Sequence, residues 1–238
     1  MGALRVSSVS GSSAYDRASS GAQGYASALN SGKDRRPARS GSKPLTAAQE
    51  KPAAATSRVR IVGGQWRSRR IEFVAAPEVR PTPDRIRETL FNWLQADVPG
   101  SRCLDLFAGS GALGFEAASR GAREVTLVER ERRVVRSLEA AVAALGATGV
   151  HVVEADAFAF LARAQTPYDL VFLDPPFAKG WLVELCTLLE TRGWLAPHAS
   201  IYLECAAKEG APALPAGWTI HRSTKAGEVG AHLVRRTP

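Results

Sequence analysis

The segment DLFAGSGALG, residues Asp105–Gly114, is the strongest indication of the fold of this 238-residue chain. It carries the pattern G-x-G-x-x-G at Gly109, Gly111 and Gly114, directly after an apolar run that predicts a strand. Glycines at this spacing let the backbone pass close to a ligand in the turn between a strand and the following helix. The stretch therefore predicts a sheet that binds an adenosine-containing ligand, and by itself it leaves the identity of that ligand open.

Predicted strands and helices alternate from this turn onward. A helix is expected at about residues 112–119, and the segments EVTLVE, VHVVEAD, YDLVFLD and SIYLEC have the apolar character of buried strands. Helical segments such as RRVVRSLEAAVAALG and WLVELCTLLE lie between them, an alternation typical of a parallel sheet covered by helices on both faces. The last segment, WTIHRSTKAGEVGAHLVRR, predicts two successive strands. The expected fold is α/β and Rossmann-like, with a mostly parallel seven-stranded sheet completed by a C-terminal antiparallel hairpin.

Two further segments precede the sheet. Residues 1–57 contain twelve Ser, twelve Ala and six Gly without apolar periodicity, so they are predicted to be a disordered tail. We favour a disordered extension of a bacterial protein over an organellar transit peptide, which has a similar Arg- and Ser-rich composition. From Arg58, the runs RVRIV and RRIEF flank a Gly-Gly turn and Trp66, which predicts an Arg-rich hairpin. The expected division is a tail at 1–57, a hairpin at 58–80 and a ligand-binding domain at 81–238.

The segment RPTPDRIRETLFNWL predicts a helix with a clear start. Thr82 is expected as its N-cap, with Pro83 at the first helical position and Asp84 in the first turn. Four apolar residues recur at helical spacing and predict one buried face: Ile86, Leu90, Phe91 and Leu94. Arg85 and Arg87 fall outside this face, so we expect both to point toward solvent or substrate.

The positive charge of the chain is concentrated near its beginning. The net charge is +8, and residues 1–57 and 58–87 each carry eight Lys or Arg against three Asp or Glu. Residues 88–238 are left with a net charge of −2. A basic region ahead of the ligand-binding domain indicates contact with an anionic polymer such as a nucleic acid.

Membrane and metal functions find no support in the sequence. The longest apolar runs, such as YDLVFLD, are too short to cross a bilayer. The three cysteines and four histidines are scattered without the spacing of a zinc site. We therefore expect core thiols, a reducing compartment, no bound metal and no membrane span.

Acidic residues follow the second, third and fourth predicted strands. Glu129 is placed to accept hydrogen bonds from ribose hydroxyls, and Asp156 from an adenine amino group. The fourth strand ends in DPPF, residues 174–177, whose two prolines remove two N–H donors and leave carbonyls and one carboxylate. This cleft suits an amino group, and Phe177 offers a flat face to a base. A dinucleotide-dependent oxidoreductase shares the glycine loop and Glu129 but has no use for DPPF, so a methyltransferase is favoured.

This motif set resembles that of class I methyltransferases, which use S-adenosylmethionine to methylate exocyclic amines. The segments RIVGGQWRSRRI, RPTPDRIRETLFNWL, FAGSGALGFEAASRGA and VFLDPPF are together similar to the RsmD-type enzymes, which methylate N2 of a guanine in small-subunit ribosomal RNA. The similarity runs from about Arg60 to the C-terminus. The sequence departs from the family in KAGEVGAHLV, with Glu228 where relatives often have Gln and Ala231 where they often have Tyr. A substrate contact from that strand is therefore not carried over to this chain.

The resemblance implies S-adenosylmethionine as the cofactor and small-subunit ribosomal RNA, in an assembled or partly assembled particle, as the partner of a monomeric bacterial cytoplasmic enzyme. We expect Asp174 and the carbonyl of Pro175 to accept the two protons of the guanine amine, while Phe177 stacks on the base. Catalysis is assigned to Asp174, Pro175, Pro176 and Phe177. Cofactor binding is assigned to Asp105, Phe107, Gly109, Gly111, Glu129, Asp156, Ala157 and, in a segment that closes over the donor in the family, Arg80 and Thr82. RNA binding is assigned to Arg60, Trp66, Arg67, Arg69, Arg70, Arg85 and Arg87.

Two alternatives remain beside this interpretation. A DNA adenine-N6 methyltransferase needs a sizeable target-recognition region to read bases in the major groove, and the chain has no room for one on either side of DPPF. The other alternative is a catalytically silent RNA-binding assembly factor on the same fold, against which the intact glycine loop and DPPF argue.

Overall fold

The computed structural model describes residues 56–74, 82–163 and 166–237. The predicted tail, apart from its last two residues, and Arg80 lie outside these ranges. The predicted N-terminal hairpin is present as β1 (Thr56–Arg60) and β2 (Arg70–Val74), which pair antiparallel as a separate two-stranded sheet. Alternate residues of the two strands, among them Val59, Ile71 and Phe73, are buried, because successive side chains of a strand point to opposite faces.

The first helix, α1, spans Asp84–Trp93 and begins one residue later than expected. Its N-cap residue is Pro83, without a side-chain cap. The prediction of Thr82 as the N-cap is wrong, because the hydroxyl of Thr82 donates instead to the buried carboxylate of Glu204, 122 positions away in the chain. The four apolar residues predicted to form the buried face of this helix are all buried.

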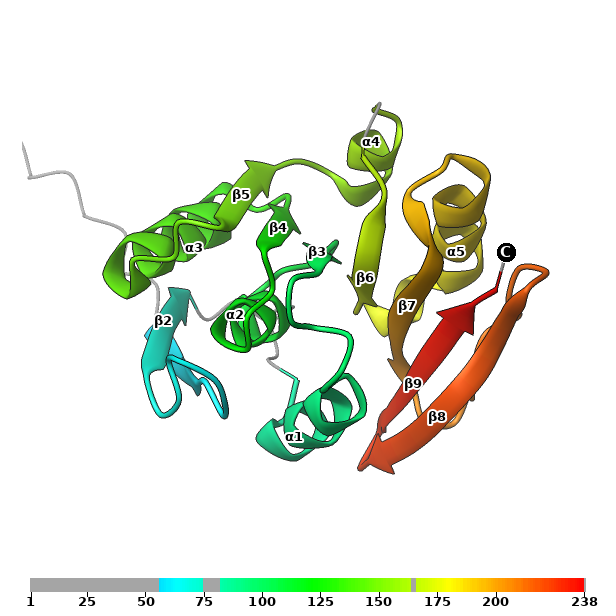
Figure 1. Cartoon of the computed structure of the whole chain (residues 1–238), viewed down its shortest axis with the longest axis horizontal. Helices are drawn as coiled ribbons and strands as arrows, with labels where there is room; N and C mark the ends of the chain where they lie inside the picture. Colours follow the sequence, from blue (N-terminus) through cyan, green and yellow to red (C-terminus); the bar gives the residue numbers. More distant parts are fainter. Residues whose placement is uncertain (1–55, 75–81, 164–165, 238) are drawn as a thin grey trace, which may run out of the picture. The chain divides into compact units, whose positions relative to one another are not determined.

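A seven-stranded sheet forms the centre of the protein, in the strand order β5-β4-β3-β6-β7-β9-β8 (Figure 1). Five neighbouring strands are parallel, and β9 runs antiparallel to both β7 and β8. The predicted Rossmann-like fold with its C-terminal hairpin is therefore confirmed. The strands are β3 (Arg102–Asp105), β4 (Glu124–Glu129), β5 (Val150–Glu154), β6 (Tyr168–Leu173), β7 (Leu195–Ala206), β8 (Trp218–Ala226) and β9 (Val229–Arg236).

Helices cover both faces of this sheet. They are α2 (Ala112–Ser119), α3 (Arg132–Leu145), α4 (Ala157–Leu161) and α5 (Leu182–Thr191), with a short 3-10 turn η1 (Phe177–Lys179). One cluster of buried side chains joins α1, α2 and α3 to one face of the sheet and includes the buried side of the hairpin. A second cluster joins α4 and α5 to the other face. The hairpin is thus anchored to the same core as the helices of the first face.

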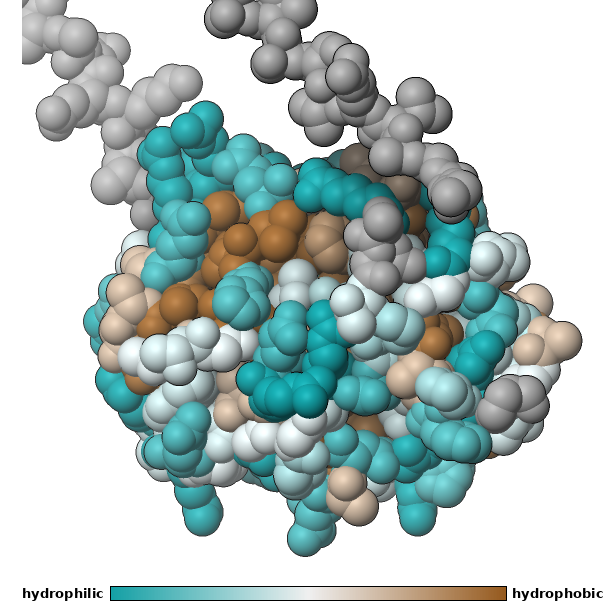
Figure 2. Space-filling model, turned by 45° about the horizontal axis from the view of Figure 1, so that its top comes forward, coloured by the Kyte–Doolittle hydropathy of each residue, from teal (hydrophilic) through white to brown (hydrophobic). Residues whose placement is uncertain are grey.

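The connections place a crevice at the carboxyl ends of the central strands. From β3 the chain proceeds to β4 and β5 on one side, and from β6 to β7 on the other (Figure 1). In open parallel sheets this change of direction is where ligands bind. The face of the molecule in Figure 2 is mainly hydrophilic, with its largest hydrophobic patch in the upper part of the view and smaller hydrophobic areas elsewhere. Within the described ranges, no helix has the length and apolar character needed to cross a bilayer.

Candidate active site

A cavity of about 1450 Å³ opens at the carboxyl ends of β3, β4, β6 and β7. It gathers most of the residues that the sequence assigned to catalysis and cofactor binding, although they come from distant parts of the chain. Those that line it are Thr82, Asp105, Phe107, Gly109, Glu129, Asp156, Ala157, Asp174, Pro175, Pro176 and Phe177. Gly111 is not among the lining residues, and Arg80 lies outside the described residues.

The glycine loop owes its shape to two left-handed residues and one close approach. Gly109 and Gly111 have positive φ angles of 50° and 74°. A Cβ at Gly111 would lie 2.5 Å from the ring of Phe115 and 2.8 Å from Leu138, so this glycine serves the turn rather than the cavity wall. At Gly114 a Cβ would collide with Leu127, which explains why α2 packs so closely on β4.

Asp105 ties the loop to the sheet. Its Oδ2 accepts a hydrogen bond from the N–H of Gly114 at 3.1 Å, and the residue is 2% exposed. Burial raises the pKa of this carboxyl to about 7, although the backbone hydrogen bonds from Gly114 and Phe107 act in the opposite direction. Asp105, the last residue of β3, thus connects the strand to the end of the glycine loop.

Glu129 and Asp156 are each held in place by backbone N–H groups. Glu129 accepts from Gly109 at 3.0 Å and from Glu131 at 2.8 Å. Asp156 caps α4 by accepting from the N–H groups of Phe158 and Ala159. Both carboxylates line the cavity, so their orientation is fixed while part of each remains available to a ligand.

The carboxylate of Asp174 stands just beyond the end of β6. No hydrogen bond to it occurs within the part of the chain that the structure describes, and Pro175 and Pro176 beside it have no N–H to offer. Burial, together with the nearby charges of Glu204 and Asp105, raises the pKa of Asp174 well above its usual value. An unpaired carboxylate with a raised pKa in a cavity is a strong proton acceptor.

Glu204 is a further cavity carboxylate, which the sequence reasoning missed. It lies in β7 and is 3% exposed. Its Oε2 accepts hydrogen bonds from the hydroxyl groups of Tyr202 at 2.8 Å and Thr82 at 3.2 Å. Burial raises the pKa of Glu204. The available signal was the acidic residue near the end of the apolar segment SIYLEC, the same pattern that marks Asp174.

The sequence reasoning named Phe107 but missed the two aromatic residues that pack beside it, Phe158 and Trp181. The rings of Phe107 and Trp181 stack with centroids 6.3 Å apart, and Phe158 meets Trp181 edge-on at 5.4 Å. Phe107 and Trp181 both line the cavity. The tryptophan four residues after Phe177 was the signal, because aromatic rings near such a site provide stacking surfaces.

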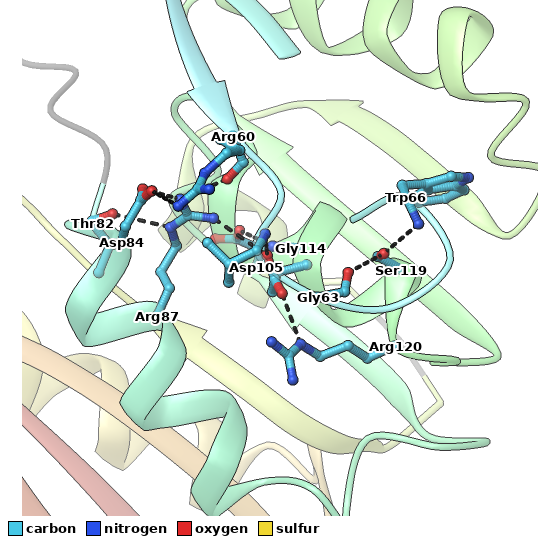
Figure 3. Close-up of polar contacts among 12 residues, drawn as sticks. Arg60, Gly63, Trp66, Thr82, Asp84, Arg87, Asp105, Gly114, Ser119 and Arg120 are labelled. Carbon is cyan, nitrogen blue, oxygen red and sulfur yellow. Dashed lines mark hydrogen bonds and ion pairs between the residues drawn. The ribbon is translucent and has the colours of Figure 1, made fainter. Parts of the chain in front are cut away.

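Arg87 is fully buried, so the expectation that it points to solvent or substrate is wrong. Its guanidinium donates to the carbonyl oxygens of Arg60 at 2.7 Å and Thr82 at 3.2 Å, and it forms ion pairs with Asp84 and Glu116 (Figure 3). Glu116, on α2, is also fully buried. The helical pattern could not reveal this position, because the buried partner Glu116 is 29 residues away in the chain.

The buried Glu116 connects the hairpin to α1 and α2. One of its oxygens accepts from the N–H of Val62 at 2.8 Å, and the other pairs with Arg120 at 2.7 Å. Close by, the hydroxyl of Ser119 accepts from the N–H of Trp66 and donates to the carbonyl of Gly63 (Figure 3). The loop of the hairpin is therefore fixed to the end of α2.

Most of the other residues assigned to RNA binding are exposed. They are Arg60, Arg67, Arg69, Arg70 and Arg85, whereas Trp66 is half-buried against the core. Arg69 donates to the carbonyl of Ala144 at the end of α3, and Arg60 pairs with Asp84 at 3.1 Å. The hairpin thus presents a basic surface on a firmly anchored element.

The two departures from the family pattern have different places in the structure. Glu228 lines the cavity. Ala231 is fully buried and stands opposite Glu204 in the register of β9 with β7. The acidic side chain therefore belongs to the cavity wall, whereas the small one packs within the sheet.

The chain is similar in sequence to known proteins. The family model described as Conserved hypothetical protein 95 matches residues 59–235. The chain is 48% identical over 181 residues to Ribosomal RNA small subunit methyltransferase D of Escherichia coli (strain K12), which covers 76% of this chain and 91% of that protein. The protein of the same name from Haemophilus influenzae is 39% identical over 183 residues, with 75% and 94% covered.

Solved structures are similar as well. The yhhF protein of Escherichia coli, 48% identical, superposes with a TM-score of 0.69 over 76% of this chain and 99% of its own. SMU.776, solved in complex with SAH, is 15% identical and shares the fold alone, with a TM-score of 0.59 over 79% of this chain and 57% of its own. Since the family model spans more than half of the chain and the relatives match over nearly their whole length, the chain belongs to the RsmD family of ribosomal RNA methyltransferases.

Proposed function

We propose that the protein transfers a methyl group from S-adenosylmethionine to the exocyclic N2 amine of a guanine in small-subunit ribosomal RNA. The observation that carries this proposal is the carboxylate of Asp174, which has no hydrogen-bond partner within the described residues and faces the cavity beside two prolines. The names of the relatives, which are small-subunit ribosomal RNA methyltransferases, support the class of substrate.

The residues of the cavity fit S-adenosylmethionine. Gly109 adds no side chain to the cavity wall, and Glu129 and Asp156 offer fixed carboxylates for the ribose and the adenine. The carboxylates of Asp105, Asp174 and Glu204 favour a cationic ligand. When bound, S-adenosylmethionine supplies an electrophilic methyl group on a positively charged sulfur.

Methyl transfer also requires that the guanine amine, which is a weak nucleophile, becomes more reactive. The lone pair of the guanine amine is delocalised into the ring, and hydrogen bonds from its two protons to Asp174 and to the carbonyl of Pro175 draw the nitrogen toward a tetrahedral geometry. The same two acceptors stabilise the positive charge that develops on the nitrogen. The raised pKa of Asp174 makes its carboxylate a suitable acceptor for the proton that the methylated amine releases.

The RNA approaches from the side of the hairpin. The exposed side chains of Arg67 and Arg70 contact phosphates, and the guanine turns out of the RNA into the cavity, where Phe177 stacks on it. The enzyme acts as a monomer on an assembled or partly assembled small subunit in the bacterial cytoplasm, without a metal ion.

The test offers methyl-labelled S-adenosylmethionine and the purified protein to unmodified small-subunit particles, free ribosomal RNA and DNA, and then identifies the labelled nucleoside. We expect N2-methylguanosine from the particles. Asp174→Asn should abolish turnover while S-adenosylmethionine still binds, whereas Glu184→Gln, an exposed residue of α5, serves as the control. Label in N6-methyladenine, or no label in any substrate, would refute the proposal in favour of a DNA methyltransferase or an inactive assembly factor.

A further inference from the structure

Asp174 and Glu204 follow paired residues of two neighbouring parallel strands. Leu173, the last residue of β6, pairs in register with Leu203 of β7, and the next residue along the chain is an acid in both cases. Side chains in register on parallel strands point to the same face. Both carboxyl groups therefore point to the face of α1, where they line the same cavity.

The two oxygens of Glu204 have different surroundings. Oε2 accepts hydrogen bonds from the hydroxyl groups of Tyr202 and Thr82. Oε1 accepts no hydrogen bond from any described residue, and Glu204, which is 3% exposed as a whole, lines the cavity. A donor at this oxygen would replace the water that burial removes, and the two hydroxyl groups hold the carboxylate in one orientation. One fixed oxygen of Glu204 is thus left for a donor that enters the cavity.

A guanine supplies donors in the arrangement that these two carboxylates require. Its Watson–Crick edge carries an N1–H directly beside the N2 amine, so two adjacent nitrogens both donate. Adenine and cytosine present an unprotonated ring nitrogen next to their amino group, which would place a lone pair against a carboxylate. The imino N–H of uracil has no amino neighbour. Among the four bases, only guanine pairs with two adjacent acceptors in this way.

We propose that Oε1 of Glu204 accepts the N1–H of the target guanine while Asp174 takes the N2 amine, so that Glu204 determines the specificity for guanine. This assignment rests on the proposed function. The raised pKa values of both groups agree with it, because each carboxylate is destabilised by burial until a donor replaces water. Thr82 and Tyr202 act as positioning residues that keep Oε1 directed at the base.

The experiment measures the contribution of the N1–H to methylation separately from that of the amine. The position of the methylated guanine in the labelled RNA is mapped first, and 2-aminopurine then replaces that guanine, since this base keeps the N2 amine but has an unprotonated N1. Reconstituted particles with either base are methylated by the wild-type protein, and kcat/KM is measured for both. We expect 2-aminopurine to react roughly 10²-fold or more slowly, as sites built around a substrate N–H reject analogues that lack it.

Glu204→Gln then tests the residue itself. The amide of Gln donates to the unprotonated N1 of 2-aminopurine, so the preference for guanine should fall by more than tenfold, whereas Glu184→Gln should keep the wild-type ratio. Equal rates of the wild-type protein on both bases would overturn the proposal, and this arm requires no variant to fold. A Glu204→Gln protein that is slower on both bases with an unchanged ratio would overturn it too, because it would indicate a structural role alone. No methylation of guanine by the wild-type protein would instead refute the proposed function, and the guanine assignment with it.

Discussion

Replacing Arg87 with Met should destabilise the fold rather than weaken RNA binding. The substitution keeps an unbranched side chain of similar length in α1 but removes a fully buried guanidinium. It breaks the ion pair with Glu116 and leaves the carbonyl oxygens of Arg60 and Thr82 without this donor. The loss therefore affects the hairpin, the start of α1 and α2 together.

The expected loss in the free energy of unfolding depends on the contacts that Glu116 keeps. Removing one partner of a buried ion pair costs about 3–5 kcal/mol. Because Glu116 keeps both Arg120 and the N–H of Val62, we expect the lower end, about 3 kcal/mol. For a protein of this size that corresponds to a decrease of roughly 6–12 °C in Tm.

The assay is urea and thermal denaturation of the purified variant, with Arg85→Met as the matched control on the same helix. Arg85 is exposed, so its replacement should change the stability by no more than about 0.5 kcal/mol. If Arg87→Met is no less stable than Arg85→Met, the buried network does not hold the hairpin as described here.

Three further outcomes are expected. Glu129→Ala should weaken the binding of S-adenosylmethionine at least tenfold by calorimetry, because the ribose loses its acceptor and Gly109 its backbone partner; unchanged affinity would contradict the ribose role. The folded-state pKa of Asp105, about 7, lies above its usual value of 3.8, so the folded state binds the proton more tightly. The stability from this group is fully present below pH 3.8 and is lost as the pH rises through 7. Urea denaturation of Asp105→Asn at a series of pH values should therefore show a shallower decline than the wild type over this interval, and parallel curves would contradict the assignment. Finally, Arg67→Ala and Arg70→Ala should each weaken RNA binding in fluorescence anisotropy and reduce the slope of log K against log salt by about 1; a slope equal to that of the wild type would exclude phosphate contacts at that position.

Local patterns in the sequence predicted the elements well because short-range physics controls them. The helix expected at residues 112–119 has those bounds in the structure, since Gly111 begins it in a left-handed conformation that other residues rarely adopt. The two predicted strands of the hairpin pair as expected because their alternating residues bury one side. The start of α1 was one residue in error, since Thr82 satisfies its hydroxyl with Glu204 across the fold rather than with the helix.

The α/β fold, the glycine loop and the DPPF motif could be recognised from the sequence, because each depends on periodicity, turn residues or missing N–H groups within a few positions. The surroundings of the charged residues became visible only in the folded chain. Arg87 can be buried because it forms an ion pair with Glu116, which lies on another helix. Glu204 lines the cavity because β7 lies beside β6. Burial and pairing of a charge depend on partners that are distant in the chain, and no local pattern contains them.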